Sequence, residues 1–265
     1  MKMKKFINAP ENLTQELLEG LAAAYPQKVK LDEGKIVVRA KPKSEDKVAI
    51  ITLGGAGHEP ALSGFVGEGL LDASVVGDIF AAPNAVSLLA GLRKFKRDAG
   101  ILLVVLNHAG DVRSANMAMK MAQREGIKLK SILVADDISA GLDTPLADRR
   151  GLAGCIPLFK VAGAAAEEGK SLDEVYEIAE KFNSRIATLA VAMTGCTHPQ
   201  NGQPITELGD DEMEIGMGQH GEGGGGRSKI LTADETAKIM FGDLSKAVSL
   251  KAGEKIFVAV NGVGA

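Results

Sequence analysis

The fold follows from residues 48–60, which read Val-Ala-Ile-Ile-Thr-Leu-Gly-Gly-Ala-Gly-His-Glu-Pro. The first six form a short, continuous apolar run rich in β-branched side chains, which is typical of a strand covered on both faces. The glycines then permit a tight turn in which main-chain N–H groups can face an oxygen-rich ligand, with His58 at its tip. The stretch therefore predicts a buried strand that delivers a histidine to one edge of a sheet.

Two further apolar runs, residues 101–106 (Ile-Leu-Leu-Val-Val-Leu) and 131–135 (Ser-Ile-Leu-Val-Ala), have the same character. Apolar stripes at helical spacing occupy residues 84–95 and 114–124, between these runs. Such an alternation predicts a doubly wound α/β domain, with a mostly parallel sheet and helices on both faces. In this architecture, ligands bind at the carboxyl ends of the strands.

A second, smaller α/β (α+β) domain is expected after a boundary near Asn183. The predicted domains are residues 1–183 and 184–265. Because the chain stops on a strand and turn with no following element to cover them, we expect the second domain to be incomplete at its C-terminus. The expected elements of this domain are a strand over 186–193, a helix over 232–241 and a final strand over 255–260.

Composition indicates an ordinary cytoplasmic protein. The 265 residues are 45% hydrophobic and carry a net charge of -3, so no basic surface for nucleic acid or for an anionic membrane is expected. The positive start, residues 1–6, continues without the apolar core of a signal peptide, and no run approaches about 18 apolar residues. Cys155 and Cys196 lack CxxC spacing, which argues against a disulfide framework or a zinc site.

Residues 213–227 place His220 among glycines. Met213, Ile215 and Met217 alternate with other residues at period two, which predicts a short half-buried strand that delivers the histidine loop. The alternative is a flexible surface linker that contains a histidine. We favour the first interpretation, because a strand that ends on a histidine holds that histidine in place.

Asp111 follows the strand at 101–106, so it lies at the same sheet edge as His58. In a parallel sheet the two loops can converge, which makes both side chains candidates for a catalytic site. Two structural alternatives stay open at this point. Asp111 could cap the helix that follows it, and His58 could be hydrogen-bonded for structure alone.

No nucleotide or metal site is expected on this chain. The glycine turn before His58 lacks the lysine and hydroxyl of a P-loop, and its spacing differs from the Rossmann fingerprint. His58, His198 and His220 could supply metal ligands, but no spacing favours a metal. The pair at 136–137, Asp-Asp, is interpreted as strand-end residues that orient the loop at 149–150, Arg-Arg.

Five segments in order along the chain carry a family resemblance. They are residues 6–10 (Phe-Ile-Asn-Ala-Pro), 54–69 (from Gly-Gly-Ala-Gly-His-Glu-Pro to Gly-Phe-Val-Gly-Glu-Gly), 107–111 (Asn-His-Ala-Gly-Asp), 149–151 (Arg-Arg-Gly) and 212–221 (Glu-Met-Glu-Ile-Gly-Met-Gly-Gln-His-Gly). Together they resemble the substrate-binding subunit family of the dihydroxyacetone kinases, DhaK, over the whole chain.

The resemblance implies a phosphotransferase that acts on an alcohol group. His220 would form a covalent hemiaminal with the ketone carbon of dihydroxyacetone, and His58 and Asp111 would flank the bound triose. It implies no cofactor on this chain, because Mg-ADP or Mg-ATP would lie on a separate DhaL-type subunit, recharged by DhaM in the phosphotransferase-system version. It also implies a homodimer. The substrate-binding residues that it implies are Gly54, Gly55, Ala56, Gly57, His58, Asp111 and His220.

Three positions depart from the family pattern. Leu53 replaces a glycine, Ala56 a serine and Leu106 a lysine. Loss of the hydroxyl and the ammonium removes two polar contacts, each worth about 1–3 kcal/mol if buried against the ligand. The changes at Ala56 and Leu106 motivate one alternative, a kinase subunit for a four-carbon ketose such as erythrulose. A second alternative, of a different class, is a non-catalytic ketose-binding coactivator or sensor. Retention of both His58 and Asp111 favours an enzyme over a sensor.

Overall fold

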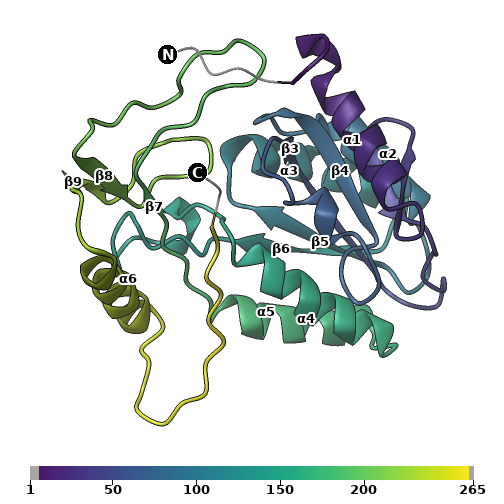
Figure 1. The fold of residues 1–265 in the computed structure, drawn as a ribbon. Helices are drawn as coiled ribbons and strands as arrows, with labels where there is room; N and C mark the ends of the chain where they lie inside the picture. The colour runs from purple at the N-terminus through teal and green to yellow at the C-terminus, as the bar shows by residue number, and fades with distance from the viewer. Residues whose placement is uncertain (1–5, 263–265) are drawn as a thin grey trace.

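The computed structural model describes residues 6–262 and centres on a six-stranded sheet (Figure 1). The strand order is β1-β2-β4-β3-β5-β6, and β3 pairs in parallel with both β4 and β5. β6 continues the parallel part, whereas β1 and β2 form an antiparallel edge. This confirms the predicted α/β fold with a mostly parallel sheet. The strands are β1 Val29–Asp32, β2 Ile36–Arg39, β3 Ala49–Ala56, β4 Ala73–Ile79, β5 Ile101–Leu106 and β6 Leu129–Val134.

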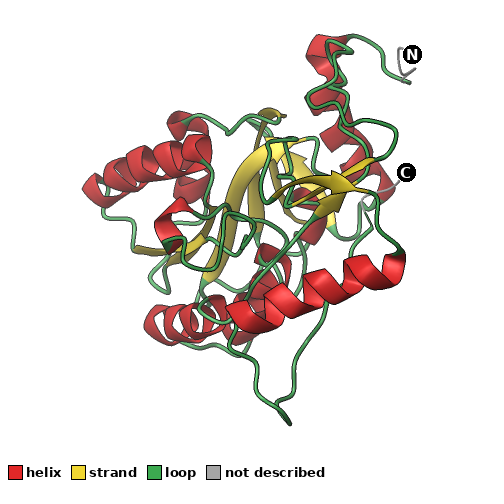
Figure 2. Ribbon diagram, turned by 90° about the vertical axis from the view of Figure 1, so that its left-hand side faces the viewer, coloured by secondary structure: helices red, strands yellow, loops and turns green. Residues whose placement is uncertain are grey.

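Helices cover both faces of this sheet (Figures 1 and 2). One apolar core lies under α1, α4 and α5, and the other lies under α2 and α3. None of the helices within the described residues is long and apolar enough to cross a membrane. The helices are α1 Leu13–Ala24, α2 Ala85–Lys94, α3 Ala109–Arg124, α4 Cys155–Glu167, α5 Leu172–Asn183 and α6 Ala233–Ala247, with short 3-10 turns at Pro10–Asn12, Ser63–Phe65 and Leu146–Asp148.

Two helix starts decide how the site is built. Asn84 caps α2, its side chain accepting the N–H of Ser87 at 2.9 Å. The helix predicted over 114–124 begins five residues earlier, at Ala109, because His108 already adopts the extended backbone of an N-cap residue. Asp111 therefore lies in the first turn of α3, facing the carboxyl edge of the sheet.

A second, three-stranded antiparallel sheet contains β7 Val191–Ala192, β8 Glu212–Ile215 and β9 Gly226–Lys229. The short strand predicted before His220 is confirmed as β8. The strand predicted over 186–193 is wrong in extent, because only the two residues of β7 pair with a neighbour.

The strand predicted over 255–260 is wrong. These residues form no strand, and their apolar side chains are exposed, with Val260 95% exposed, because no neighbouring strand offers its backbone groups to them. The domain boundary near Asn183, the last residue of α5, stays a prediction. The outermost residues of the two predicted domains, 1–5 and 263–265, lie outside the described residues.

A buried charge network ties the amino ends of the strands together. The Asp72 carboxylate accepts from Lys43 Nζ at 2.7 Å, from the Ile50 N–H at 2.8 Å and from Arg39 Nη1 at 3.1 Å. Arg39 in turn donates to Glu167 at 2.6 Å, at the end of α4. Since the side chains of Lys43 and Asp72 are each only 1% exposed, each charge depends on the other for its stabilisation.

We expect Asp72→Asn to lower the free energy of unfolding by roughly 3–5 kcal/mol, because it leaves a buried ammonium without its anion. Urea unfolding measures this change. As a control, Asp243→Asn breaks the exposed Asp243–Lys246 pair, whose side chains are 42% and 66% exposed, and should change the stability by less than about 1 kcal/mol. Equal effects of the two substitutions would contradict the role assigned to the network.

Candidate functional site

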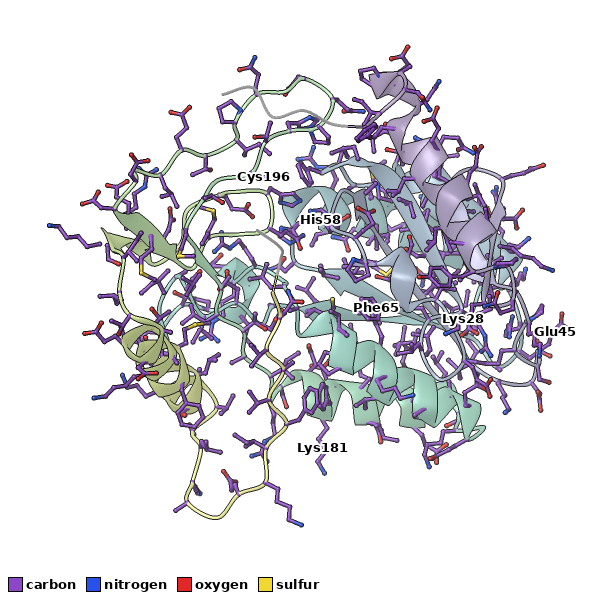
Figure 3. All side chains as sticks on the ribbon, in the orientation of Figure 1. Lys28, Glu45, His58, Phe65, Lys181 and Cys196 are labelled. Carbon is purple, nitrogen blue, oxygen red and sulfur yellow. The ribbon has the colours of Figure 1, made fainter. Side chains whose placement is uncertain are left out.

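A cavity of about 260 Å³ lies at the carboxyl ends of β3, β4 and β5, under the loop that joins β8 to β9. Pockets for drug-sized ligands span about 300–1,000 Å³, so this cavity suits a smaller molecule. Figure 3 shows His58 at this edge of the large sheet, facing the loops of the small one. The lining residues are Leu53, Gly54, Gly55, His58, Ala61, Leu62, Phe80, Ala81, Ala82, Leu106, His108, Ala109, Gly110, Asp111, Gln219 and His220.

His58 presents a neutral, unpaired nitrogen at this cavity. Its Nδ1 lies 3.1 Å from the carbonyl oxygen of Gly55, which can only accept, so Nδ1 carries the proton. Nε2 is then an acceptor, and it is buried without a partner among the described residues. Burial lowers the pKa of His58 to about 4, against the opposing hydrogen bond to Gly55, and the neighbouring His220 and His108 lower it further. At neutral pH, His58 can therefore orient a hydroxyl group.

Asp111 is a buried carboxyl group with a raised pKa. Its residue is only 8% exposed, and burial raises the pKa to about 7, although His220 acts in the opposite direction. Its Oδ1 has no hydrogen-bond partner among the described residues. The capping alternative is wrong, since His108 occupies the N-cap position of α3 and no side chain caps that end. A carboxyl group with a pKa near 7 is suited to accept and release a proton.

His220 lies in a held loop, which excludes the flexible-linker alternative. Its ring centre is 4.8 Å from that of His58, 5.1 Å from that of His108 and 5.8 Å from that of Phe80. The Glu222 carboxylate accepts the His220 backbone N–H at 2.9 Å, and its other oxygen lies 3.5 Å from Nδ1. A carboxylate facing Nδ1 favours the proton on that nitrogen and leaves Nε2 free as a nucleophile.

The carboxyl group of Glu222 is ionised at this position. Burial alone would raise its pKa, but hydrogen bonds from the His220 side chain and from backbone N–H groups outweigh burial and lower the pKa to about 2. The loop thus carries a permanent negative charge two residues after its histidine. That charge lies 3.5 Å from Nδ1 of His220.

The predicted substrate-binding residues of the glycine turn before His58 differ in whether they reach the cavity. Gly54 and Gly55 line the cavity, whereas Ala56 is buried at the end of β3. The N–H of Gly57 donates to the Glu59 carboxylate, at 3.0 and 3.2 Å to its two oxygens. The predicted turn of free N–H groups is therefore wrong at Gly57, because a neighbouring side chain already occupies this donor.

Four residues of the site were missed by sequence reasoning. His108 and Glu222 lay inside quoted motifs, and the scarcity of histidine was a usable signal, since the four histidines of the chain gather around this cavity. Gln219, which lies 3.0 Å from His108 Nε2, gave no such signal. Phe80 contacts the rings of His58, His198 and His220 and has a φ of 57°. No sequence pattern predicts these contacts or this backbone conformation.

Among residues 6–262, one set of side chains could hold a metal ion. Ligand atoms of His108, His220 and Glu222 lie within 4.8 Å of one another. However, His108 Nε2 already lies 2.8 Å from the carbonyl oxygen of Gly151 and so carries its proton. This hydrogen bond leaves Nδ1 as the nitrogen of His108 that could bind a metal.

A family model for the Dak1 domain matches residues 19–265. The chain belongs to the Dak1 family. It is 41% identical over 263 residues to a protein of Listeria innocua named PTS-dependent dihydroxyacetone kinase 1, dihydroxyacetone-binding subunit DhaK, with 99% of this chain and 80% of that one covered. The recognition of this family from sequence motifs is confirmed.

Two solved structures share this Dak1 fold. The dihydroxyacetone kinase of C. freundii superimposes with a TM-score of 0.86 at 34% identity, covering 92% of this chain and 45% of that one. The dihydroxyacetone kinase operon co-activator Dha-DhaQ does so with a TM-score of 0.83, also at 34% identity, covering 89% and 73%. A kinase and an operon co-activator therefore share this architecture.

We expect Asp111→Asn to stabilise the protein at pH 8 by roughly 1–3 kcal/mol, because the buried carboxyl has a raised pKa. Between about pH 4 and pH 7 the unfolded chain has lost this proton while the folded chain keeps it, so the wild type loses stability as the pH rises. The gain of the variant should therefore shrink toward pH 4.5. Urea unfolding across this range tests it, with Asp98→Asn at an exposed position as the control. A variant less stable than the wild type at pH 8 would contradict the raised pKa.

Proposed function

We propose that this chain is the ketose-binding subunit of a dihydroxyacetone kinase of the phosphotransferase-system type. The observation that carries the proposal is the convergence of His220, His58 and Asp111 on one small cavity, the last two with unpaired buried atoms. Membership of the Dak1 family and the similarity to a DhaK subunit support it. Each side chain has a distinct task in the reaction.

His220 captures the substrate through its ketone carbon. Its Nε2 lone pair adds to the carbonyl carbon, a C–N bond forms, and the π electrons of the C=O bond move to the oxygen. The Nδ1 proton passes along the Glu222 side to solvent water, and the new alkoxide takes one proton from water, so the product is a neutral hemiaminal and Glu222 stays ionised. No oxidant, reductant or loss of water is needed. The addition removes the translational freedom of the ketose and excludes glycerol, which has no carbonyl group.

Asp111 then acts as the general base. The captured ketose presents a terminal hydroxyl to the carboxylate, which takes its proton as the oxygen attacks a phosphoryl group. An O–P bond forms, and the bond to the leaving nucleotide oxygen breaks. His58, with its unpaired Nε2 acceptor, orients a substrate hydroxyl for this step. Leu53 and Leu106 supply apolar walls where the family pattern has a glycine and a lysine.

The nucleotide in this proposal, Mg-ADP or Mg-ATP, lies on a separate DhaL-type subunit, and its triphosphate form gives up the terminal phosphoryl group and is restored by a DhaM-type protein. The carboxyl edge of the sheet ends in histidines and an aspartate and carries no lysine-bearing phosphate loop. The co-activator alternative shares the fold. The buried, raised-pKa carboxyl of Asp111 favours the kinase, because binding alone needs no base. The homodimer stays a prediction.

We expect the intact mass of the chain to rise by the full mass of the ketose, since hemiaminal formation loses no water. Dihydroxyacetone and erythrulose are the probes, and carbon-13 NMR of the labelled ketone carbon should show a tetrahedral signal. His220→Ala should abolish both readouts. His198→Ala, at a histidine whose ring also contacts Phe80, should keep them. An adduct that loses water, or that survives in the His220 variant, would place the attachment on another group.

We expect the purified chain to bind Mg-ATP with a dissociation constant weaker than about 1 mM, measured by calorimetry. Phosphorylation of the ketose should begin only when a nucleotide-loaded DhaL-type subunit is added. In that assay Asp111→Asn should lower kcat about 100-fold or more, because an amide cannot take the hydroxyl proton, while the mass adduct persists. Tight nucleotide binding without the partner would overturn the two-subunit arrangement.

A further inference from the structure

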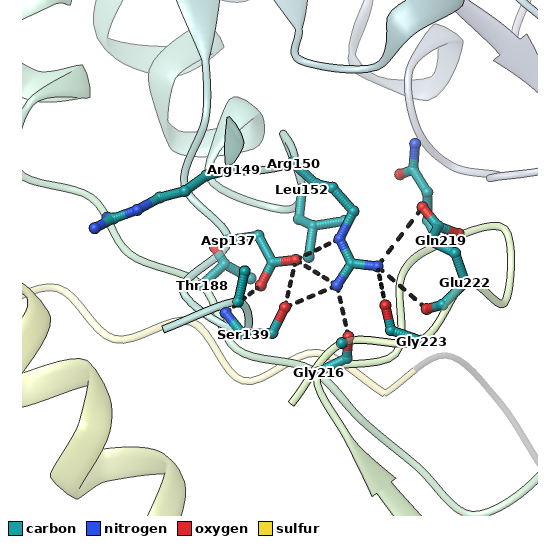
Figure 4. A network of polar contacts seen from close by, with 12 residues as sticks. Asp137, Ser139, Arg149, Arg150, Leu152, Thr188, Gly216, Gln219, Glu222 and Gly223 are labelled. Atoms are coloured by element: carbon teal, nitrogen blue, oxygen red, sulfur yellow. Dashed lines mark hydrogen bonds and ion pairs between the residues drawn. The ribbon is translucent and has the colours of Figure 1, made fainter. Parts of the chain in front are cut away.

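We infer that Arg150 is a positioning residue that clamps both ends of the His220 loop to the carboxyl edge of the large sheet. The inference rests on the proposed function in that His220 is taken as the nucleophile. The clamp consists of hydrogen bonds and an ion pair made by the Arg150 side chain, and Figure 4 shows the residues that form them.

The fixed side of the clamp lies just after β6. Asp137 is 1% exposed, and its Oδ2 accepts from Arg150 Nε at 2.7 Å. Ser139 is tied to the same carboxylate through its N–H and its hydroxyl, and its Oγ accepts from Arg150 Nη2 at 2.8 Å. A buried ion pair braced in this way holds the guanidinium plane in one orientation.

The other side of the clamp is the backbone of the loop. Before His220, the carbonyl of Gly216 accepts from Nη2 at 2.6 Å. After His220, the carbonyls of Glu222 and Gly223 accept from Nη1 at 3.1 and 3.2 Å. Together with the contacts to Asp137 and Ser139, these bonds provide an acceptor for every N–H of the Arg150 guanidinium group.

Gly218 of the loop lies close to this guanidinium. A Cβ added at Gly218 would lie 2.5 Å from Arg150 Nη1 and 2.3 Å from the carboxyl carbon of Glu222. Gly216 has a φ of 88°, which L side chains rarely adopt, and this conformation accompanies the inward carbonyl. Close approach to the guanidinium therefore explains the glycine at 218, whereas Gly221 and Gly224 are close to Thr206 and to the carbonyl of Gly216.

The clamp matters for chemistry because His220 lies between its two attachment points. Addition to a carbonyl needs the nitrogen at near-attack distance, and misplacement by about 1 Å can cost about 100-fold in rate. A lysine offers three donors from a single atom and cannot span both ends of the loop. Arg149 is a natural control, since its guanidinium donates to the carbonyls of Thr144 and Leu142, at 2.9 and 2.7 Å, and not to the His220 loop.

The test compares Arg150→Lys, Arg150→Ala and Arg149→Ala in the full chain. Arg150→Lys keeps a positive charge beside Asp137, so it should unfold at nearly the wild-type temperature. It should weaken dihydroxyacetone adduct formation about 10-fold or more by intact mass and speed deuterium exchange over residues 216–223. Methylguanidinium added to Arg150→Ala should restore part of the adduct, which a merely structural role would not allow. Arg149→Ala should match the wild type in both measurements.

Wild-type adduct affinity and wild-type exchange in Arg150→Lys would overturn the inference. So would equal losses in Arg149→Ala. If the wild-type chain forms no adduct with either ketose, the proposed function fails. Deuterium exchange over residues 216–223 still decides the clamp in that case, because it needs no substrate.

Discussion

The parallel pairing of β3 with both β4 and β5 is the constraint on which the site depends. It brings the carboxyl ends of three strands to one edge, so that His58, Phe80 and Asp111 follow neighbouring strands although they are far apart in the chain. The same edge is built of short polar and glycine-rich turns, while the interior of β3 and β5 is wholly buried. A rigid, apolar platform thereby holds groups that must differ in charge and protonation.

Desolvation gives these groups their different properties. Burial keeps His58 neutral and Asp111 ready to exchange a proton near neutrality, whereas Glu222 stays ionised because several N–H groups point at it. The network around Asp72, at the opposite end of the strands, is also buried, but it pairs its charges fully. At the cavity, by contrast, the buried Nε2 of His58 and Oδ1 of Asp111 have no hydrogen-bond partner among the described residues, and a ligand can complete their pairing.

Much of the fold was predictable because buried parallel strands leave a clear sequence pattern, and the runs at 48–53 and 101–106 follow it. The strand predicted over 255–260 is absent although its residues follow a strand pattern. Apolar, β-branched residues form a strand only where a partner backbone is available, and local sequence does not show whether one is. His220, His58 and Asp111 were predictable from loops and a resemblance. Phe80 and Gln219 were not, because their roles arise from long-range packing that local patterns do not encode.

In the proposed reaction, the capture group and the base come from different sheets. His220 lies in the loop between β8 and β9 of the small antiparallel sheet, and Asp111 lies in the first turn of α3, after β5 of the large sheet. Holding a ketose and activating its hydroxyl are thus separable tasks in evolution. Under this proposal, replacing one side chain on the large sheet would remove the activation of the hydroxyl and leave the capture of the ketose in place. One architecture can in this way serve both metabolism and its sensing.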